Sequence, residues 1–514
     1  MPLCLTLRRA LTAVFLVFIV GCSSSSPAPN TSVLSSNSPS TPKDAIPKDL
    51  QAYIDQMSTS ITLMELPDYI TGALPEKITK QQALEDVDVL RYLLDNAYSG
   101  RHYWQYRGVD FPKGYENLRR YIKNEKTNDI DTRAFESQIY QTFIGINDPH
   151  TAIIGHETSE FFTRIRQYLA RFVVAKKGTR FFVVQSAEER VPVGAEFLDA
   201  QDKLLPTLSP TGEQHYLFGI MDTIPIETMR VRLNIGEVNV AMHPCRIGNI
   251  SYDRFENIIE LKHIESIPVI RSSSFWVEGK IKELEAFSEM GKTLRNEPMF
   301  IWNLLANDGG ITQYPAAFIE NFNTIQQDAA WMVHLHSTPI AQAYFPGKNG
   351  WSSWPAAWLD DATPLESIPA YKRAHVTQVR QEKVDLISNP RRYWKIVGEI
   401  PEKKVGDYAG KMIVLSNYRN GSAGNNALAM SKSVPNSLII GENSNMTYAF
   451  ANTRNFSLKH SRIKLRLPGR LIINPENSIE RGFLPDLWLD SETPVEEVIE
   501  WLRRPDTYQF QYKN

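Results

Sequence analysis

Residues 415–427 contain the serine most suggestive of chemistry, Ser422, which follows an apolar run and precedes the expected start of a helix. The apolar residues predict a strand, and the small residues after Ser422 predict a helix that continues through Met430. At a helix N-terminus, local N–H groups and the positive end of the helix dipole can stabilise negative charge beside a serine oxygen. An ordinary capping serine is far more common at this position. Ser422 is therefore a candidate nucleophile that needs partners elsewhere in the chain.

Two further segments supply such partners. Residues 303–310 end an apolar run in Gly309 and Gly310, and paired glycines let a backbone N–H approach a substrate carbonyl. Residues 147–151 place a single histidine, His150, after a tight turn, and an imidazole is the natural base for a serine hydroxyl. Taken alone, His150 suits a helix-end cap better. Together, the three segments supply a hydroxyl, a possible base and backbone N–H groups that could act on one carbonyl.

Helices are expected before these segments, to hold the histidine. Residues 81–95 show helical spacing of apolar residues after Thr79, which is suited to cap the helix. Residues 131–144 form a second predicted helix, entered through Asp131 or Thr132. The sequence thus predicts a helical N-terminal lobe.

The rest of the chain changes character twice. Between about residues 160 and 262, short runs rich in β-formers predict a small β-rich insert. From about residue 266, apolar runs without alternation predict strands buried on both faces of an α/β sheet layer. These runs lie at residues 267–270, 299–305 and 412–415, and helical segments such as residues 280–294 separate them.

The first residues predict an exported lipoprotein. Arg8 and Arg9 precede an apolar run at residues 10–20, which is shorter than the roughly 20 residues that cross a bilayer. The sequence Ile-Val-Gly-Cys that ends at Cys22 resembles a bacterial lipobox, in which the cysteine is lipidated after residues 1–21 are removed. A plain signal peptide is the alternative. Residues 22–48, rich in serine and proline at their start, predict a flexible tether that would hold the protein at a membrane.

Composition excludes several classes of protein. The 56 Lys and Arg residues nearly balance 58 Asp and Glu residues, which argues against a nucleic-acid partner. The chain has three cysteines without the spacing of a zinc site, and Cys245 is expected to be a small core residue. His334 and His336 would share one strand face, but no third metal ligand is near them in the sequence. No metal and no cofactor are expected.

The order of these segments resembles that of the C-terminal-processing (tail-specific) proteases and the tricorn core protease, which are serine peptidases with a crotonase-like α/β fold. The resemblance covers roughly residues 80–500 and is weaker between residues 160 and 265. The matching segments are residues 148–151, 307–310, 422–423, 441–442, 467–468 and 479–486.

The resemblance implies a role for each matched residue. Ser422 takes the nucleophile position, His150 the general base, and Glu480 the carboxylate that orients the base. The backbone N–H of Ala423, with that of Gly309 or Gly310, would form the oxyanion hole. Another branch of the family uses a Ser-Lys dyad, but the lysines after Ser422 lie at unsuitable spacings, so the histidine form is favoured.

The resemblance also implies the domain organisation. A helical lobe at residues 49–160 would precede the β-rich insert at residues 161–264 and the α/β protease core at residues 265–514. The insert stands where many relatives carry a PDZ-like peptide-binding domain. Residues 191–198 look similar to part of such a domain, but the carboxylate-binding loop is missing, so a purely structural insert is an equal alternative.

The predicted function is a lipid-anchored serine peptidase of the bacterial cell envelope that acts on polypeptides through Ser422, His150 and Glu480. Departures from the family pattern, such as Asn425 in place of an acid, indicate a divergent member. The alternative is a catalytically silent lipoprotein that binds a peptide or an apolar ligand on the same fold. The sequence leaves the oligomeric state open.

Overall fold

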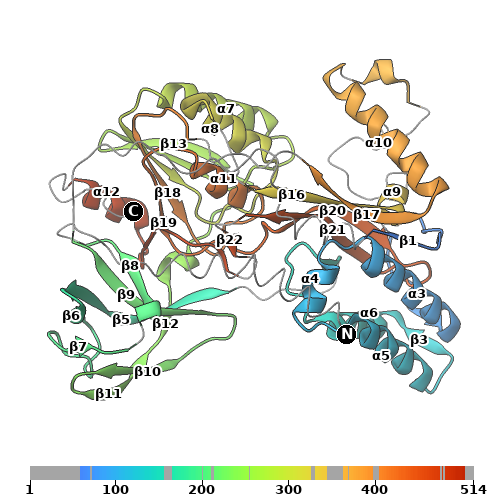
Figure 1. Ribbon diagram of the computed structural model, residues 1–514, viewed down its shortest axis with the longest axis horizontal. Helices are drawn as coiled ribbons and strands as arrows, with labels where there is room; N and C mark the ends of the chain where they lie inside the picture. The colour runs from blue at the N-terminus through green and yellow to red at the C-terminus, as the bar shows by residue number, and fades with distance from the viewer. Residues whose placement is uncertain are drawn as a thin grey trace. The chain divides into compact units, whose positions relative to one another are not determined.

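The protein is a mixed α/β chain in its computed structural model (Figure 1). The structure describes residues 58–69, 72–154, 165–199, 201–209, 213–253, 255–325, 330–343, 363–368, 370–397, 405–474, 477–478 and 481–503. Cys22 and the rest of the predicted signal and tether lie outside these residues, and so does Glu480.

The chain divides into two compact units, and each is built from three separate segments. Unit 1 comprises Met1–Phe162, Ala330–Glu402 and Ala449–Pro475. Unit 2 comprises Thr163–Ala329, Lys403–Tyr448 and Glu476–Asn514. Unit 1 therefore contains the predicted helical lobe together with two stretches of the region expected to form the α/β core.

The helical part of unit 1 begins as the sequence predicts. Helix α3 (Lys80–Asn96) starts with a capping box, because the Thr79 hydroxyl accepts the Gln82 N–H and the Gln82 side chain accepts the Thr79 N–H. Asp131 caps α6 (Thr132–Phe143) by accepting the Ala134 N–H at 2.8 Å. Both predicted helices are confirmed. Among the described residues, the other helices of this unit are α4 (Arg101–Tyr106), α5 (Phe111–Asn124), α9 (Thr338–Gln342) and α10 (Ala370–Ser388).

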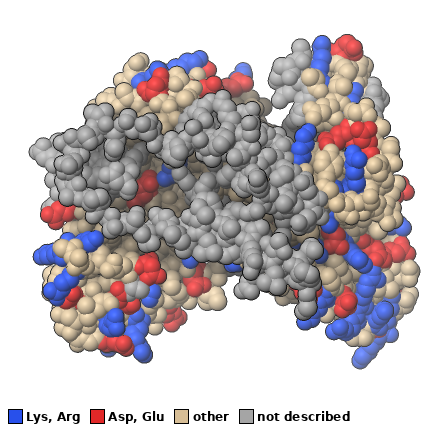
Figure 2. Space-filling view, in the orientation of Figure 1, with Lys and Arg blue, Asp and Glu red and all other residues tan. Residues whose placement is uncertain are grey.

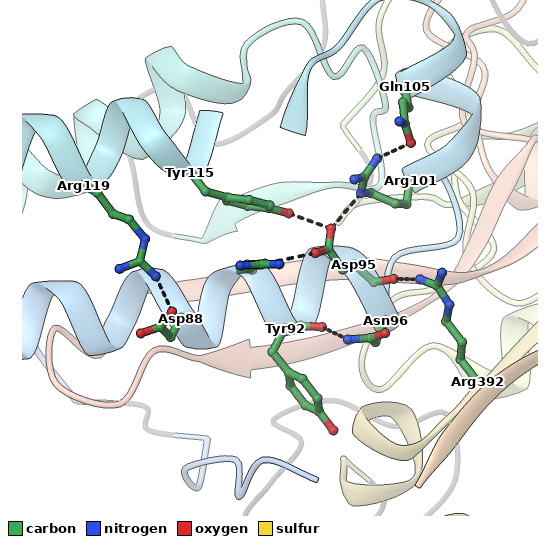
Figure 3. Close-up of polar contacts among 10 residues, drawn as sticks. Asp88, Tyr92, Asp95, Asn96, Arg101, Gln105, Tyr115, Arg119 and Arg392 are labelled. Atoms are coloured by element: carbon green, nitrogen blue, oxygen red, sulfur yellow. Dashed lines mark hydrogen bonds and ion pairs between the residues drawn. The ribbon is translucent and has the colours of Figure 1, made fainter. Parts of the chain in front are cut away.

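One carboxylate joins three of these helices (Figure 3). Asp95, near the end of α3, accepts hydrogen bonds from Nε of Arg101 on α4 at 2.9 Å and from the hydroxyl of Tyr115 on α5 at 3.0 Å. Arg119 of α5 pairs with Asp88, which lies about two turns before Asp95 on α3. Arg392 donates to the backbone carbonyl of Asp95, which connects α3 to the sheet of the same unit.

The sheet of unit 1 carries His150 at its edge. Strand order is β1-β17-β16-β21-β20, and β4 pairs with β21 in antiparallel register, with Ile153 opposite Leu465. Because β4 begins two residues after His150, the sheet fixes the chain directly beyond the histidine. The strands are β1 (Thr59–Ser60), β4 (Ala152–Ile154), β16 (Trp331–Ser337), β17 (Arg391–Val397), β20 (Phe450–Ser457) and β21 (Lys464–Ile473). A short pair, β2 (Lys77–Thr79) and β3 (Asp129–Asp131), precedes α3 and α6.

The core of unit 2 is a parallel sheet buried on both faces, as the runs without alternation predict. The order β14-β15-β18-β19-β24 is parallel throughout, and β13 (Ile259–Ile264) adds an antiparallel edge. The parallel strands are β14 (Ile267–Ser272), β15 (Met299–Asn303), β18 (Lys411–Ser416), β19 (Ser437–Gly441) and β24 (Leu487–Trp488). The helices are α7 (Ile281–Leu294), α8 (Gln313–Asn323), α11 (Ala423–Ser431) and α12 (Pro494–Leu502). Phe287 of α7 stacks on Phe318 of α8 with ring centroids 4.4 Å apart.

The predicted β-rich insert is present in unit 2, drawn in green in Figure 1. Its strands have their own apolar core, which includes Phe172 and Phe218. Strand β8 pairs in parallel with β24 through Thr207 and Trp488, so the strands of the insert continue the sheet of the core. The strands are β5 (Arg166–Lys177), β6 (Arg180–Ser186), β7 (Glu196–Phe197), β8 (Leu204–Thr207), β9 (His215–Asp222), β10 (Thr228–Leu233), β11 (Gly236–Ala241) and β12 (His243–Pro244).

The surface has no face of a single charge sign where it can be seen. Figure 2 shows Lys and Arg interspersed with Asp and Glu over the described residues of that view. Among the helices that the structure describes, none combines the length and the apolar character needed to cross a bilayer.

Candidate active site

Ser422 lies between β18 and α11 in a strained backbone conformation. Its φ of 50° and ψ of −119° are rare for a residue with a side chain, and such conformations cost about 1–3 kcal/mol. Ser422 stands at the N-cap position of α11, but its side chain makes no capping hydrogen bond. The side chain is also partly exposed. The capping role weighed from the sequence is therefore not the role that Ser422 has in this structure.

Polar neighbours hold this strained turn in place. The N–H of Ser422 donates to the hydroxyl of Thr447, and that hydroxyl donates to the side-chain oxygen of Asn445. Asn425, in the first turn of α11, donates its side-chain N–H to the backbone carbonyl of Asn445 at 2.9 Å. The turn and the segment after β19 are thus bonded together on both sides of Ser422. None of the sequence motifs assigned a role to Thr447 or Asn445.

The turn that contains Gly309 and Gly310, which we call the glycine turn, lies directly against the turn that contains Ser422, which we call the serine turn. The backbone N–H of Gly421 donates to the carbonyl of Asn307 at 2.8 Å. Gly309 has a φ of 96°, and a Cβ placed on it would lie only 2.4 Å from the Cβ of Ser422. Gly310 has a φ of 130°, and a Cβ there would lie 2.4 Å from the backbone of Phe275. Both positions require glycine, because any side chain would collide with a neighbouring backbone or with Ser422.

The hydrogen bonds distinguish the two glycines as donors. The N–H of Gly309 is occupied, because it donates to the side-chain oxygen of Asn307 at 2.9 Å. The N–H groups of Gly310 and Ala423 meet no acceptor within the part of the chain that the structure describes. Ala423 is the first residue of α11, where N–H groups have no partner inside the helix. Gly310 and Ala423, rather than Gly309, are the N–H groups available to a ligand.

His150 belongs to unit 1 and is held by its backbone and its ring. Its N–H donates to Oδ1 of Asp148 at 2.9 Å, and its Nδ1 bonds to the carbonyl of Phe450. A carbonyl only accepts, so Nδ1 carries the proton and Nε2 keeps its lone pair. Burial lowers the pKa of His150 to about 4, and the nearby Arg466 guanidinium adds to this effect. The imidazole is therefore neutral at neutral pH.

Asp148 supports the histidine from a fully buried position. Besides the N–H of His150, it accepts the hydroxyls of Thr151 at 2.7 Å and Tyr98 at 2.9 Å. Burial raises the pKa of Asp148 to about 6, and these hydrogen bonds oppose that shift. The sequence marked Asp148 only as part of a motif, and Tyr98, on the segment after α3, carried no recognisable signal.

The other predicted residues fall into three groups. Glu480 and Cys22 lie outside the described residues, so their roles stay predictions. Cys245 is buried, as expected of a small core residue. His336 bonds through Nδ1 to Glu382 at 2.6 Å, and no group of residues suited to hold a metal ion occurs in the described part of the chain.

No family model matches the sequence, and no curated protein matches it either. Solved structures similar to this chain include mature CPAF complexed with lactacystin, at 15% identity and a TM-score of 0.41, covering 83% of this chain and 97% of that one. The photosystem II D1 C-terminal processing protease is similar at 12% identity and a TM-score of 0.35, covering 82% and 96% of the two chains. A solved structure from Parabacteroides merdae is similar at 10% identity and a TM-score of 0.37, covering 82% and 93%.

Because the identities and TM-scores are low, the role of each residue in this chain has to be argued from its own geometry.

Proposed function

We propose that this protein is a serine peptidase that hydrolyses peptide bonds, with Ser422 as its nucleophile. The observation that carries the proposal is the turn at Ser422, which combines backbone strain, an uncapped hydroxyl and adjacent unused N–H groups. A strained residue at a helix N-terminus usually persists because the conformation serves a function. A helix cap would need neither the strain nor the free hydroxyl.

The mechanism follows from the groups that remain free. His150, neutral and with its lone pair on Nε2, would accept the proton of Ser422 while the serine oxygen attacks the substrate carbonyl. The N–H groups of Gly310 and Ala423 would bind the resulting oxyanion, a contribution that is typically worth about 100- to 1,000-fold in rate. His150 would then return the proton to the leaving amine, and water would hydrolyse the acyl intermediate by the same route.

In this proposal, a backbone carbonyl sets the tautomer of His150. The carbonyl of Phe450 already accepts the proton of Nδ1, which is the task that a carboxylate performs in a Ser-His-Asp triad. Glu480, which the family resemblance matches to the carboxylate that orients or tunes the base, would therefore tune the base rather than select its tautomer.

The supports of the two proposed catalytic groups are close together in the sequence. Thr447 bonds Ser422 within unit 2, and Phe450 bonds His150 within unit 1. One short segment of chain thus carries the supports of both proposed catalytic groups.

The finer features of the fold belong to the same proposal. The parallel sheet of unit 2 would be the crotonase-like core, and the β-rich insert would be a PDZ-like or a structural module. The substrate would be an exported polypeptide, and a lipid on Cys22 would hold the protein in the bacterial cell envelope.

A serine-directed fluorophosphonate probe tests the proposal. We expect the wild-type protein to be labelled and Ser422→Ala to lose labelling. Ser431→Ala is the matched control, because Ser431 lies on the same helix with its hydroxyl bonded to the Ala427 carbonyl, and it should keep labelling. Labelling that survives in Ser422→Ala, or a folded wild type that is never labelled, would contradict the proposal. The second result would favour the silent binder.

A further inference from the structure

Glu442 is a fully buried acid that the mechanism above does not use. It follows the last residue of β19, and its Oε1 accepts the backbone N–H of Gln167 at 3.0 Å. Its Oε2 is buried and has no hydrogen-bond partner among the described residues. A Cβ on Gly248 would lie 2.5 Å from this oxygen, so the carboxyl group packs against the turn η2 (Arg246–Asn249).

The segment that leads to Ser422 is bonded to the same turn. We call residues 416–421 the nucleophile loop. Its Asn417 donates to the carbonyl of Ile247 at 3.0 Å, and its Arg419 donates to the carbonyl of Gly248 at 3.1 Å. At the base of the loop, the N–H of Glu442 donates to the carbonyl of Ser416 at 2.9 Å. Glu442 therefore lies where the start of β5, the turn η2 and the nucleophile loop meet.

The surroundings of Glu442 disfavour a negative charge. Burial is the largest effect and raises the pKa of Glu442 to about 8, and the carboxylate of Asp490 acts in the same direction. The N–H groups of Gln167 and Tyr418 and the guanidinium of Arg166 oppose this shift. Arg166 makes its own contacts, 4.7 Å from the Tyr418 ring centre and 3.0 Å from the side-chain oxygen of Asn249.

One further titratable group is close to Glu442. The buried thiol of Cys245, directly before η2, has a raised pKa, chiefly through burial and then through the charge of Glu442. The thiol bonds to the carbonyl of Leu489 and stays neutral. At neutral pH, Glu442 is therefore mostly protonated and the Cys245 thiol is neutral, so neither of these two buried groups adds a full negative charge to the junction.

We propose that Glu442 is a positioning residue for Ser422, which keeps the nucleophile loop seated against η2 and the start of β5 while its carboxyl group is neutral. Ionisation of the carboxyl would place a negative charge in the junction, where Oε2 is buried and has no hydrogen-bond partner among the described residues, and would loosen the loop. Because the loop ends at Gly421, directly before the strained serine, its displacement would be felt at the nucleophile. This inference rests on the proposed function.

The rate of fluorophosphonate labelling between pH 6 and pH 10 tests the proposal. In the wild type, we expect the rate to fall at least fivefold as the pH rises through about 8. Glu442→Gln keeps the shape without the ionisation, so it should label within about twofold of the wild type at pH 7 and lack the alkaline fall. Glu442→Ala should be slower by tenfold or more at every pH. Glu497→Gln, which changes an exposed acid on α12, should keep the wild-type profile.

Two results would overturn the assignment of Glu442. One is an alkaline fall of the same size in Glu442→Gln, and the other is a wild-type rate that does not fall. Amide hydrogen exchange in the wild type, corrected for its intrinsic pH dependence, serves where a variant does not fold. Protection of residues 416–421 should then decrease above pH 8 while that of β6 does not, and unchanged protection would refute the proposal. Exchange needs no activity, so it tests Glu442 even if Ser422 is never labelled.

Discussion

Gly309→Ala is the substitution that tests the contact between the glycine turn and the nucleophile. The new Cβ would lie 2.4 Å from the Cβ of Ser422, 2.8 Å from the carbonyl oxygen of Gly421 and 2.9 Å from the nitrogen of Ala423. Carbon atoms that are not bonded prefer separations of about 3.5–4.0 Å. Either the new Cβ or the atoms that it meets must therefore move by roughly 1 Å, and the three nearest of these atoms all belong to the serine turn.

The size of the effect follows from two separate costs. The backbone of Gly309 has a φ of 96°, and an alanine held there would lose about 1–3 kcal/mol of stability. A shift of about 1 Å in a reacting group lowers the rate by about 100-fold. Labelling of Ser422 should therefore slow by about two orders of magnitude, while the folded state loses a few kcal/mol at most.

Gly194→Ala separates the cost of backbone strain from the cost of displacing Ser422. Gly194 has a φ of 89°, close to that of Gly309, but a Cβ on it meets no heavy atom within 4 Å. It should show a similar strain in chemical denaturation and label at the wild-type rate. We would measure the labelling rate constant and the free energy of unfolding of both variants. If Gly309→Ala labels as fast as Gly194→Ala, the glycine turn does not set the position of Ser422, and the argument for the oxyanion hole fails with it.

Two other changes probe the supports of the proposed catalytic groups. Thr447→Val removes the acceptor of the Ser422 N–H, so the free energy of unfolding should fall by about 1–3 kcal/mol and labelling should slow. Thr447→Ser keeps the hydroxyl and should restore both. A Val variant equal to the wild type would contradict the role of Thr447 as a support of Ser422. His150 has a pKa lowered to about 4, so its neutral form persists below the usual value of 6.5, and the labelling rate should hold down to about pH 4. The stability contributed by this lowered pKa is present above pH 6.5 and is lost as the pH falls through about 4, which pH-dependent denaturation would show. A rate that already halves near pH 6.5 would refute the neutral base.

Local sequence signals predicted the elements that local interactions form. The capping box at Thr79 and the cap at Asp131 need only neighbouring residues, and both helices start where the sequence places them. The runs that became β14, β15 and β18 were recognisable because strands buried on both faces need no alternation. The glycine turn was recognisable because paired glycines allow a backbone that other residues rarely adopt, and Gly309 and Gly310 have φ of 96° and 130°.

What the sequence left open depends on contacts between distant residues. The choice between Gly309 and Gly310 depends on the side chain of Asn307, which bonds one N–H and leaves the other free. The tautomer of His150 depends on the carbonyl of Phe450, 300 residues away, and no motif connects the two. The insert was predicted as a separate module, but the pairing of β8 with β24 continues its strands into the core sheet. Which strands pair through their backbones cannot be predicted from residue types alone.

The neutral residue at position 425 shows how such contacts change the meaning of a departure from a family pattern. In the sequence, Asn425 in place of the acid of the resembling family indicates a divergent member. In the structure, the amide nitrogen of Asn425 donates to the carbonyl of Asn445, whose side chain in turn accepts the hydroxyl of Thr447. A carboxylate at 425 would present an acceptor to that carbonyl, so an acid does not suit this network. Asn425, Asn445 and Thr447 therefore form one matched set that holds the strained Ser422 without a buried charge, and the departure argues for a differently supported nucleophile rather than for a lost one.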